Sequence, residues 1–108
     1  MNSDRLLSLL GLARRAGRLT MGNDAVIDSL EEGVSALVLF ADDLSPRTAK
    51  SVELAAQNAS VETVRIARTM DQISLALGKR CGVVSINDAG FAKKAHTLIM
   101  TSREESNI

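Results

Sequence analysis

The chain has 108 residues, of which 45% are hydrophobic, and this composition indicates one globular domain rather than a disordered segment. Only two residues are aromatic, which excludes RNA binding by aromatic stacking platforms. Basic and acidic residues balance at 13 each, which disfavours a general nucleic-acid binder and limits any positive surface to a local patch.

The first half of the chain predicts two helices and two strands. Apolar spacing indicates a helix from Asp4 to Ala16, with Asp4 in its first turn and Gly17 ending it. A short extended piece at Leu19–Met21 and a helix at Asn23–Glu32 follow. The continuous apolar run Ala36–Ala41 is typical of a strand covered on both faces.

The second half of the chain also alternates between predicted helices and strands. Ser45 and Pro46 form the N-cap and first position of a third helix. The tail at Arg103–Ile108 is expected to fray. The remaining predicted elements are a helix at Pro46–Gln57, a strand at Glu62–Ala67, a helix at Met70–Leu77, a strand at Gly82–Ile86 and a helix at Ala89–Met100, capped by Asn87 and Asp88.

The alternation predicts an α/β fold, namely a three-layer α-β-α sandwich around a small mixed, mostly parallel four-stranded sheet. We expect residues 1–108 to form a single domain. A lone cysteine excludes an internal disulfide, and no apolar run reaches membrane-spanning length. The charged first segment does not read as a signal peptide, so we expect a cytoplasmic location.

Gly22-Asn23-Asp24 opens the second predicted helix and is the strongest candidate for a binding site. Free backbone N–H groups and the positive end of the helix dipole favour phosphates and other electron-rich groups there. Glycine permits close approach, and an amide beside a carboxylate can read a base edge. A polar helix cap is the alternative reading of the same triplet.

The order and spacing of several segments resemble the kink-turn RNA-binding family of ribosomal proteins L7Ae and L30e, most of all its small bacterial members of the YlxQ type. The resemblance covers about Arg5 to Leu98. Its anchors are the segments Leu10–Leu19, Gly22–Asp24, Leu37–Pro46, Leu77–Lys79 and Asn87–Lys94.

The resemblance implies a binder of sharply bent RNA, in which the start of the second helix enters the widened groove at the kink. The family pattern there is a small residue, asparagine, glutamate, two variable residues and lysine. Gly22 and Asn23 match this pattern, and Asp24 replaces the glutamate with a shorter carboxylate. Ile27 stands at the lysine position, where it cannot contact a guanine acceptor.

The resemblance also implies two further surfaces. The first is the loop before the last strand, in which Lys79 and Arg80 would meet phosphates and Cys81 and Val83, flanking Gly82, would pack on a base or sugar. The second is Ala41–Ser45, which would lie beside the helix start and contribute packing. Three arginines are additional candidates for phosphate contact, namely Arg14, Arg15 and Arg18.

Catalysis has no support in the sequence. Cys81 lacks a partner pattern for nucleophilic chemistry, and no phosphate loop or dinucleotide motif occurs. We therefore expect a non-enzymatic protein of the translation apparatus without metal or cofactor. Its partner would be structured RNA, with ribosomal RNA as one candidate, and neither a membrane nor a small-molecule substrate is expected. We expect a monomer when free.

A protein-interaction module on the same fold is the alternative function. The zero net charge and Ile27 motivate it, because both disfavour strong RNA contact. The docking face would then be the acidic surface formed by Asp28, Glu31 and Glu32.

Overall fold

Helices and strands alternate along residues 4–106, the part of the chain that this computed structural model describes. Every element predicted from the sequence is present, with boundaries that differ by one or two residues except at the last helix. The elements are α1 (Arg5–Arg15), β1 (Leu19–Met21), α2 (Asn23–Glu31), β2 (Leu37–Phe40), α3 (Pro46–Asn58), β3 (Thr63–Arg65), α4 (Met70–Leu77), β4 (Val83–Ile86) and α5 (Ala89–Ser106).

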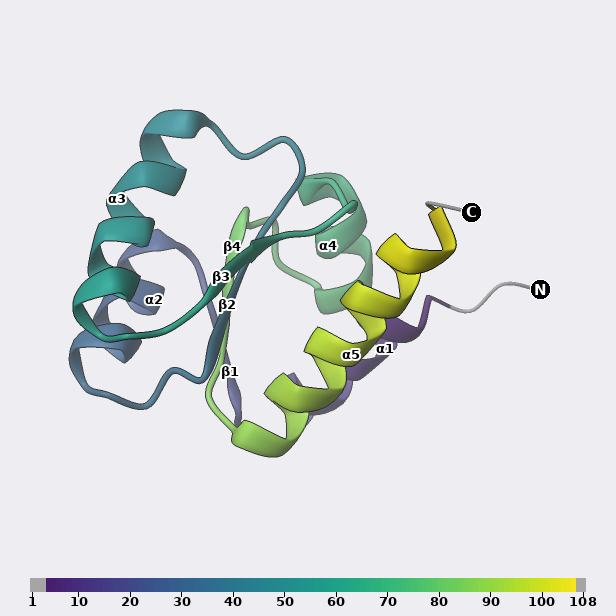
Figure 1. The fold of residues 1–108 in the computed structure, drawn as a ribbon, viewed down its shortest axis with the longest axis horizontal. Helices are drawn as coiled ribbons and strands as arrows, with labels where there is room; N and C mark the ends of the chain where they lie inside the picture. Colours follow the sequence, from purple (N-terminus) through teal and green to yellow (C-terminus); the bar gives the residue numbers. More distant parts are fainter. Residues whose placement is uncertain (1–3, 107–108) are drawn as a thin grey trace.

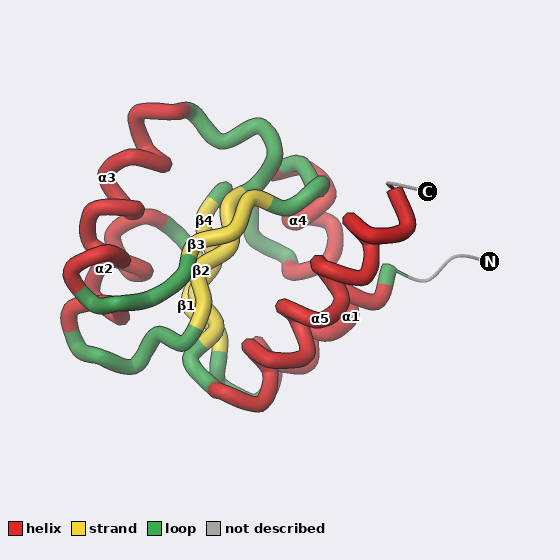
Figure 2. Tube along the Cα trace, viewed as in Figure 1, coloured by secondary structure: helices red, strands yellow, loops and turns green. Residues whose placement is uncertain are grey.

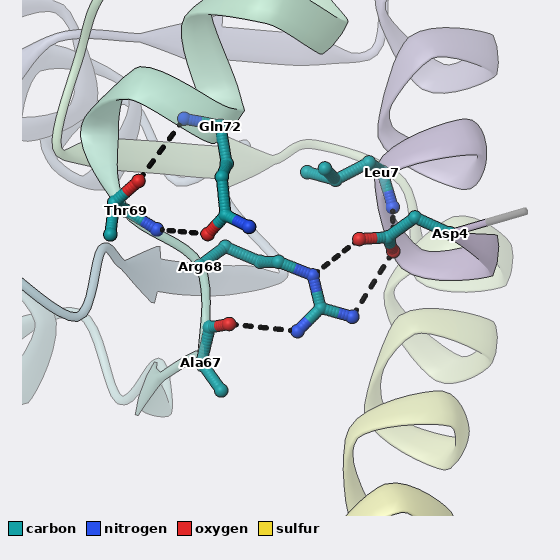
Figure 3. Close-up of polar contacts among 6 residues, drawn as sticks. All are labelled: Asp4, Leu7, Ala67, Arg68, Thr69 and Gln72. Atoms are coloured by element: carbon teal, nitrogen blue, oxygen red, sulfur yellow. Dashed lines mark hydrogen bonds and ion pairs between the residues drawn. The ribbon is translucent and has the colours of Figure 1, made fainter. Parts of the chain in front are cut away.

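Side-chain caps fix where three helices begin. The Leu7 N–H donates to Asp4 Oδ1 at 3.1 Å, which makes Asp4 the N-cap of α1 rather than a first-turn residue. The Ser45 hydroxyl caps α3 in front of its leading proline, as expected. Thr69 and Gln72 form a reciprocal capping box at the start of α4, which Figure 3 shows.

The four strands form one mixed sheet in the order β1-β4-β2-β3. β4 pairs antiparallel with both β1 and β2, and β2 pairs parallel with β3. The mixed four-stranded sheet is confirmed, but the expectation that it is mostly parallel is wrong. A buried apolar run reads the same in either strand direction, so the pattern carries no information on orientation.

Helices cover both faces of the sheet, which confirms the three-layer sandwich. Figures 1 and 2 show α2 and α3 on one side of the strands and α1, α4 and α5 on the other. The side chains of β2 alternate between these layers. Leu37 and Leu39 belong to the core with α1, α4 and α5, whereas Val38 and Phe40 belong to the core with α2 and α3.

The last helix is longer than the sequence analysis expects. α5 continues to Ser106, so the predicted end at Met100 is wrong, and residues 107–108 lie outside the described part. The expected fraying of the tail stays a prediction. No glycine or proline interrupts the chain between Phe91 and Ser106, and the helical hydrogen bonding therefore continues. Within residues 4–106, no helix is both long and apolar enough to cross a membrane.

Gly82 allows the segment after β2 and the start of α4 to close over the beginning of β4. A Cβ atom on Gly82 would lie 2.6 Å from Leu44 Cδ1 and 3.1 Å from Met70 Sδ. Both distances are shorter than ordinary contacts, so a larger residue would push these buried or half-buried side chains apart.

We expect Gly82→Ala to lower the free energy of unfolding by about 1–3 kcal/mol, the usual cost of overpacking. Gly11→Ala is the matched control, because Gly11 lies inside α1 with nothing within 4 Å of its Cβ position. That control should gain roughly 0.5–1 kcal/mol from helix propensity. Urea unfolding of the two variants measures both changes, and equal stabilities would contradict the packing argument.

An ion pair between Asp4 and Arg68 ties the start of α1 to the segment that precedes α4 (Figure 3). The second Asp4 oxygen accepts from Arg68 Nη2 at 3.1 Å and from the Leu7 N–H. Partial burial acts to raise the pKa of Asp4, but the hydrogen bonds and the charge of Arg68 outweigh it and hold the pKa below the usual 3.8.

This lowered pKa predicts a loss of stability in acid. The unfolded carboxyl takes up its proton at a higher pH than the native one, so the Asp4 contribution is complete above the ordinary pKa and is lost as pH falls through the native pKa. We expect Asp4→Asn to lose less stability than the unmodified protein between pH 6 and pH 3, because an amide still caps the helix without titrating. Urea unfolding at several pH values tests this, and parallel curves would contradict it.

Candidate nucleic-acid interface

Strand pairing brings three predicted surfaces together at one end of the sheet. Because β4 runs antiparallel to β1 and β2, its first residues lie beside the last residues of both strands. The Gly22 N–H donates to the Val83 carbonyl at 2.9 Å, and the Ala41 N–H donates to the Gly82 carbonyl at 2.8 Å. We call the resulting surface the tip, which comprises residues 22–24, 41–45 and 78–82.

Gly22 shapes the entry into α2. Its φ of 103° and ψ of 154° suit glycine, and it caps α2 without a side-chain hydrogen bond. The first helical hydrogen bond runs from the Val26 N–H to the Gly22 carbonyl. The N–H groups of Asn23, Asp24 and Ala25 precede this bond, and all three residues are exposed. The tip therefore presents backbone donors and the positive end of the helix dipole to an incoming group.

Two basic side chains lie at the tip, one beside the start of α2 and the other beside the end of α4. Lys79 Nζ lies 4.0 Å from where a Cβ atom of Gly22 would be, and Arg14 Nη1 lies 3.3 Å from the equivalent position on Gly78. Both residues are exposed, and neither takes part in the ion pairs found among the described residues. Arg14 and Lys79 therefore add two positive charges to the tip.

The other candidate basic residues have different surroundings. Arg80 forms an ion pair with Asp71 of α4. Arg15 lines a groove between α1 and α4. Arg18 lies at the opposite end of β1, where its carbonyl accepts from the Asn87 N–H at 2.8 Å. Nothing in the sequence distinguishes Arg14 from Arg15 and Arg18, since the contact with Gly78 depends on how α1 packs against α4.

The apolar residues expected to meet RNA from the last loop are turned inward. Val83 is fully buried in the core with α2 and α3, and Cys81 is buried in the core with α1, α4 and α5. The expectation that their side chains pack on a base or sugar is therefore wrong for this conformation. Burial raises the pKa of the Cys81 thiol, although the charges of Lys79 and Arg14 oppose the shift.

Ile27 is also turned toward the protein. It is half-buried and packs against the core with α2 and α3. The exposed polar side chains along this part of α2 are those of Asn23, Asp24 and Asp28. The residue at the expected lysine position thus stabilises the helix on the sheet and offers no polar contact to a ligand.

The tip has the chemistry of a binding surface. It offers backbone N–H donors, the cations of Arg14 and Lys79, the amide of Asn23 and the carboxylates of Asp24, Asp42 and Asp43, while Arg80 is paired with Asp71 and the thiol is buried. Among the side chains that the structure describes, no three His, Cys, Asp or Glu groups could hold a metal ion together. This set of groups can bind an anionic, hydrogen-bonding partner.

Comparison with known proteins finds one matching family and two similar proteins. The model of the ribosomal protein L7Ae/L30e/S12e/Gadd45 family matches residues 4–96. The chain is similar to RNA-binding protein YlxQ of Enterococcus faecium, with 33% identity over 91% of this chain and 94% of that protein. It is also similar to RNA-binding protein YlxQ of Bacillus subtilis (strain 168), with 34% identity over 84% and 91% of the two chains.

Solved structures show the same fold. A protein of unknown function from Bacillus halodurans superposes with a TM-score of 0.83 at 30% identity, over 90% of this chain and 98% of the other. A 15.5 kDa RNA-binding protein of Giardia lamblia superposes with a TM-score of 0.73 over 94% and 92% of the two chains. At 18% identity, this second likeness concerns the fold alone.

Proposed function

Because the chain belongs to the ribosomal protein L7Ae/L30e/S12e/Gadd45 family, we propose that it is a non-catalytic RNA-binding protein of the translation apparatus. Its target is a kink-turn or a similarly bent RNA, and the tip is the binding surface. The observation that carries this proposal is the convergence of Gly22–Asp24 with Arg14 and Lys79 at one end of the sheet. Two similar proteins named RNA-binding protein YlxQ support the RNA partner.

Recognition by the tip combines shape with a few polar contacts. A bent RNA opens its groove and exposes base edges that a straight duplex hides. The start of α2 enters this opening, where Asn23 both donates and accepts hydrogen bonds and Asp24 accepts from the donors of a guanine edge. Gly22 keeps the entry free of a side chain. Binding stabilises the bent form over the extended one.

Phosphate contacts come from Arg14 and Lys79. Lys79 lies beside the start of α2 and Arg14 beside Gly78, and both are free of ion pairs within the described residues, so they are available to neutralise the backbone near the kink. Arg80 is a weaker candidate because Asp71 already engages its guanidinium. Arg15 and Arg18 lie in the groove and at the far end of β1, so they are not part of the proposed surface.

We expect the double substitution of Asn23→Ala and Asp24→Ala to weaken binding to a kink-turn RNA by about 1–3 kcal/mol, the value of one good base-edge contact. A gel-shift titration with a kink-turn and a straight duplex of equal length measures the change. The matched control is Asp28→Ala, one turn further along α2, which should change affinity little. The proposal fails if the unmodified protein binds both RNAs equally, or if the double variant retains full affinity.

A second test compares Lys79, which has no ion pair among the described residues, with Arg80, which is paired with Asp71. The variants are Lys79→Ala and Arg80→Ala. Each phosphate contact contributes about one unit to the slope of log affinity against log salt concentration. We expect Lys79→Ala to reduce this slope by about one and Arg80→Ala to leave it nearly unchanged, because Arg80 is engaged by Asp71. Titrations at four salt concentrations give the slopes. Equal reductions in both variants would contradict the distinction between the unpaired Lys79 and the paired Arg80.

The alternative function, a protein-interaction module with weak or lost RNA binding, is motivated by the acidic exposed face of α2. Asp28, Glu31 and Glu32 are exposed there, and no basic residue lies in the last turn of the helix. The kink-turn titration separates the two functions, because this alternative requires equal and weak binding of bent and straight RNA.

A further inference from the structure

An apolar groove is lined by residues of α1 and α4. Figure 1 shows these two helices on the side of the sheet away from α2 and α3. Its volume is about 720 Å³, and its walls include Leu7, Gly11 and Leu12 of α1 and Leu75 and Ala76 of α4. Leu75 is 89% exposed and Leu12 is 53% exposed. Large aliphatic side chains gathered at such exposure around one groove are typical of a surface that a partner covers.

The two helices run in the same direction along the groove. Asp4 at the start of α1 pairs with Arg68 just before α4, and Arg14 at the end of α1 lies beside Gly78 just after α4. Figure 3 shows the first of these ends, with Leu7 and Gln72 next to the ion pair. Side chains of two helices that pack side by side leave a furrow between them, and a third helix can lie in such a furrow.

The side chains along the furrow follow helical spacing. On α1, Leu7 and Gly11 are four residues apart, as are Ser8 and Leu12, so these positions form one stripe over nearly two turns. The Cβ position of Gly11 has nothing within 4 Å, and the furrow is therefore open at its middle. An incoming helix can approach closely at Gly11 and pack its apolar side chains against the leucines on either side.

The charges around the groove indicate at which end a bound helix would carry a charged residue. Asp4 is neutralised by Arg68, and the nearby Asp71 is neutralised by Arg80. Arg15 lines the opposite end of the groove, and none of the ion pairs among the described residues includes it. The groove thus has an apolar middle and one available cation at the end where α1 finishes. A complementary helix carries an acidic residue at that end.

We propose that the α1–α4 groove docks an amphipathic helix of a partner protein, with an apolar stripe of about two turns and an Asp or Glu that meets Arg15. Leu12 and Leu75 are the principal apolar contacts. The site is separate from the tip, because its lining residues do not include Gly22–Asp24 or Lys79, and it does not depend on RNA binding. A helix in the groove and a ligand at the tip can be bound together.

The test uses a phage-displayed library of helical peptides of about 16 residues, selected against the whole protein. Enriched peptides should carry apolar residues at helical spacing and one acidic residue near an end. We expect Leu75→Glu to weaken their binding about tenfold or more in fluorescence anisotropy. Leu54→Glu is the matched control, because Leu54 is also exposed, at 59%, but belongs to α3 on the opposite layer.

Charge reversal tests the proposed polarity. Arg15→Glu should weaken binding of the enriched peptides and restore it for versions in which lysine replaces the acidic residue. Amide chemical shifts of the unmodified protein with bound peptide should change at Ser8, Gly11 and Ala76 and remain constant at Asn23 and Asp24. Circular dichroism establishes that the variants fold, which their exposed positions favour.

Three outcomes would overturn the proposal. Selection that enriches no helical peptide, or peptides that bind Leu75→Glu as tightly as the unmodified protein, would remove the docking site. Sedimentation that detects a dimer abolished by Leu75→Glu would assign the groove to a second copy of the chain instead. A kink-turn RNA whose affinity falls tenfold in Leu75→Glu would assign it to RNA.

Discussion

The antiparallel pairing of β1 with β4 is the contact on which the proposed binding surface depends. It joins the carbonyl of Val83 to the N–H of Gly22, two residues 61 positions apart in the sequence. This single register places the start of α2 beside the loop that carries Lys79. Because side chains alternate along a strand, a slip of one residue would turn Val83 to the opposite face of the sheet and shift the loop relative to Gly22.

β4 is also the strand against which the segment after β2 closes. The Ala41 N–H donates to the Gly82 carbonyl, and Leu44 packs over Gly82 together with Met70. The apolar side chains of the tip are therefore buried in the contacts that hold its three segments together. What remains at the surface is polar, namely the helix start with its backbone donors, the cations of Arg14 and Lys79, and the carboxylates of Asp24, Asp42 and Asp43. A chain of zero net charge can thus place backbone donors and two cations without ion pairs among the described residues close together.

The layer of α1 and α4 has the opposite character. Its groove exposes leucine side chains between two ends whose charges are mostly neutralised by internal ion pairs. Polar contacts suit the tip, and apolar contacts suit the groove. The two surfaces meet near the ends of α1 and α4, where Arg14 faces Gly78 and Arg15 enters the groove. Neighbouring arginines on one helix thus serve two surfaces, because successive positions point about 100° apart.

The sequence by itself determined the kinds of element, their order and the helix starts at Pro46 and Met70, because capping and periodicity act between residues close in the chain. It also identified Gly22–Asp24 as an exposed polar helix start. Only the tertiary structure decided the strand directions, the burial of Val83 and Cys81, the pairing of Arg80 with Asp71 and the position of Arg14 beside Gly78. Each of these depends on contacts between segments far apart in the chain, which local pattern does not encode.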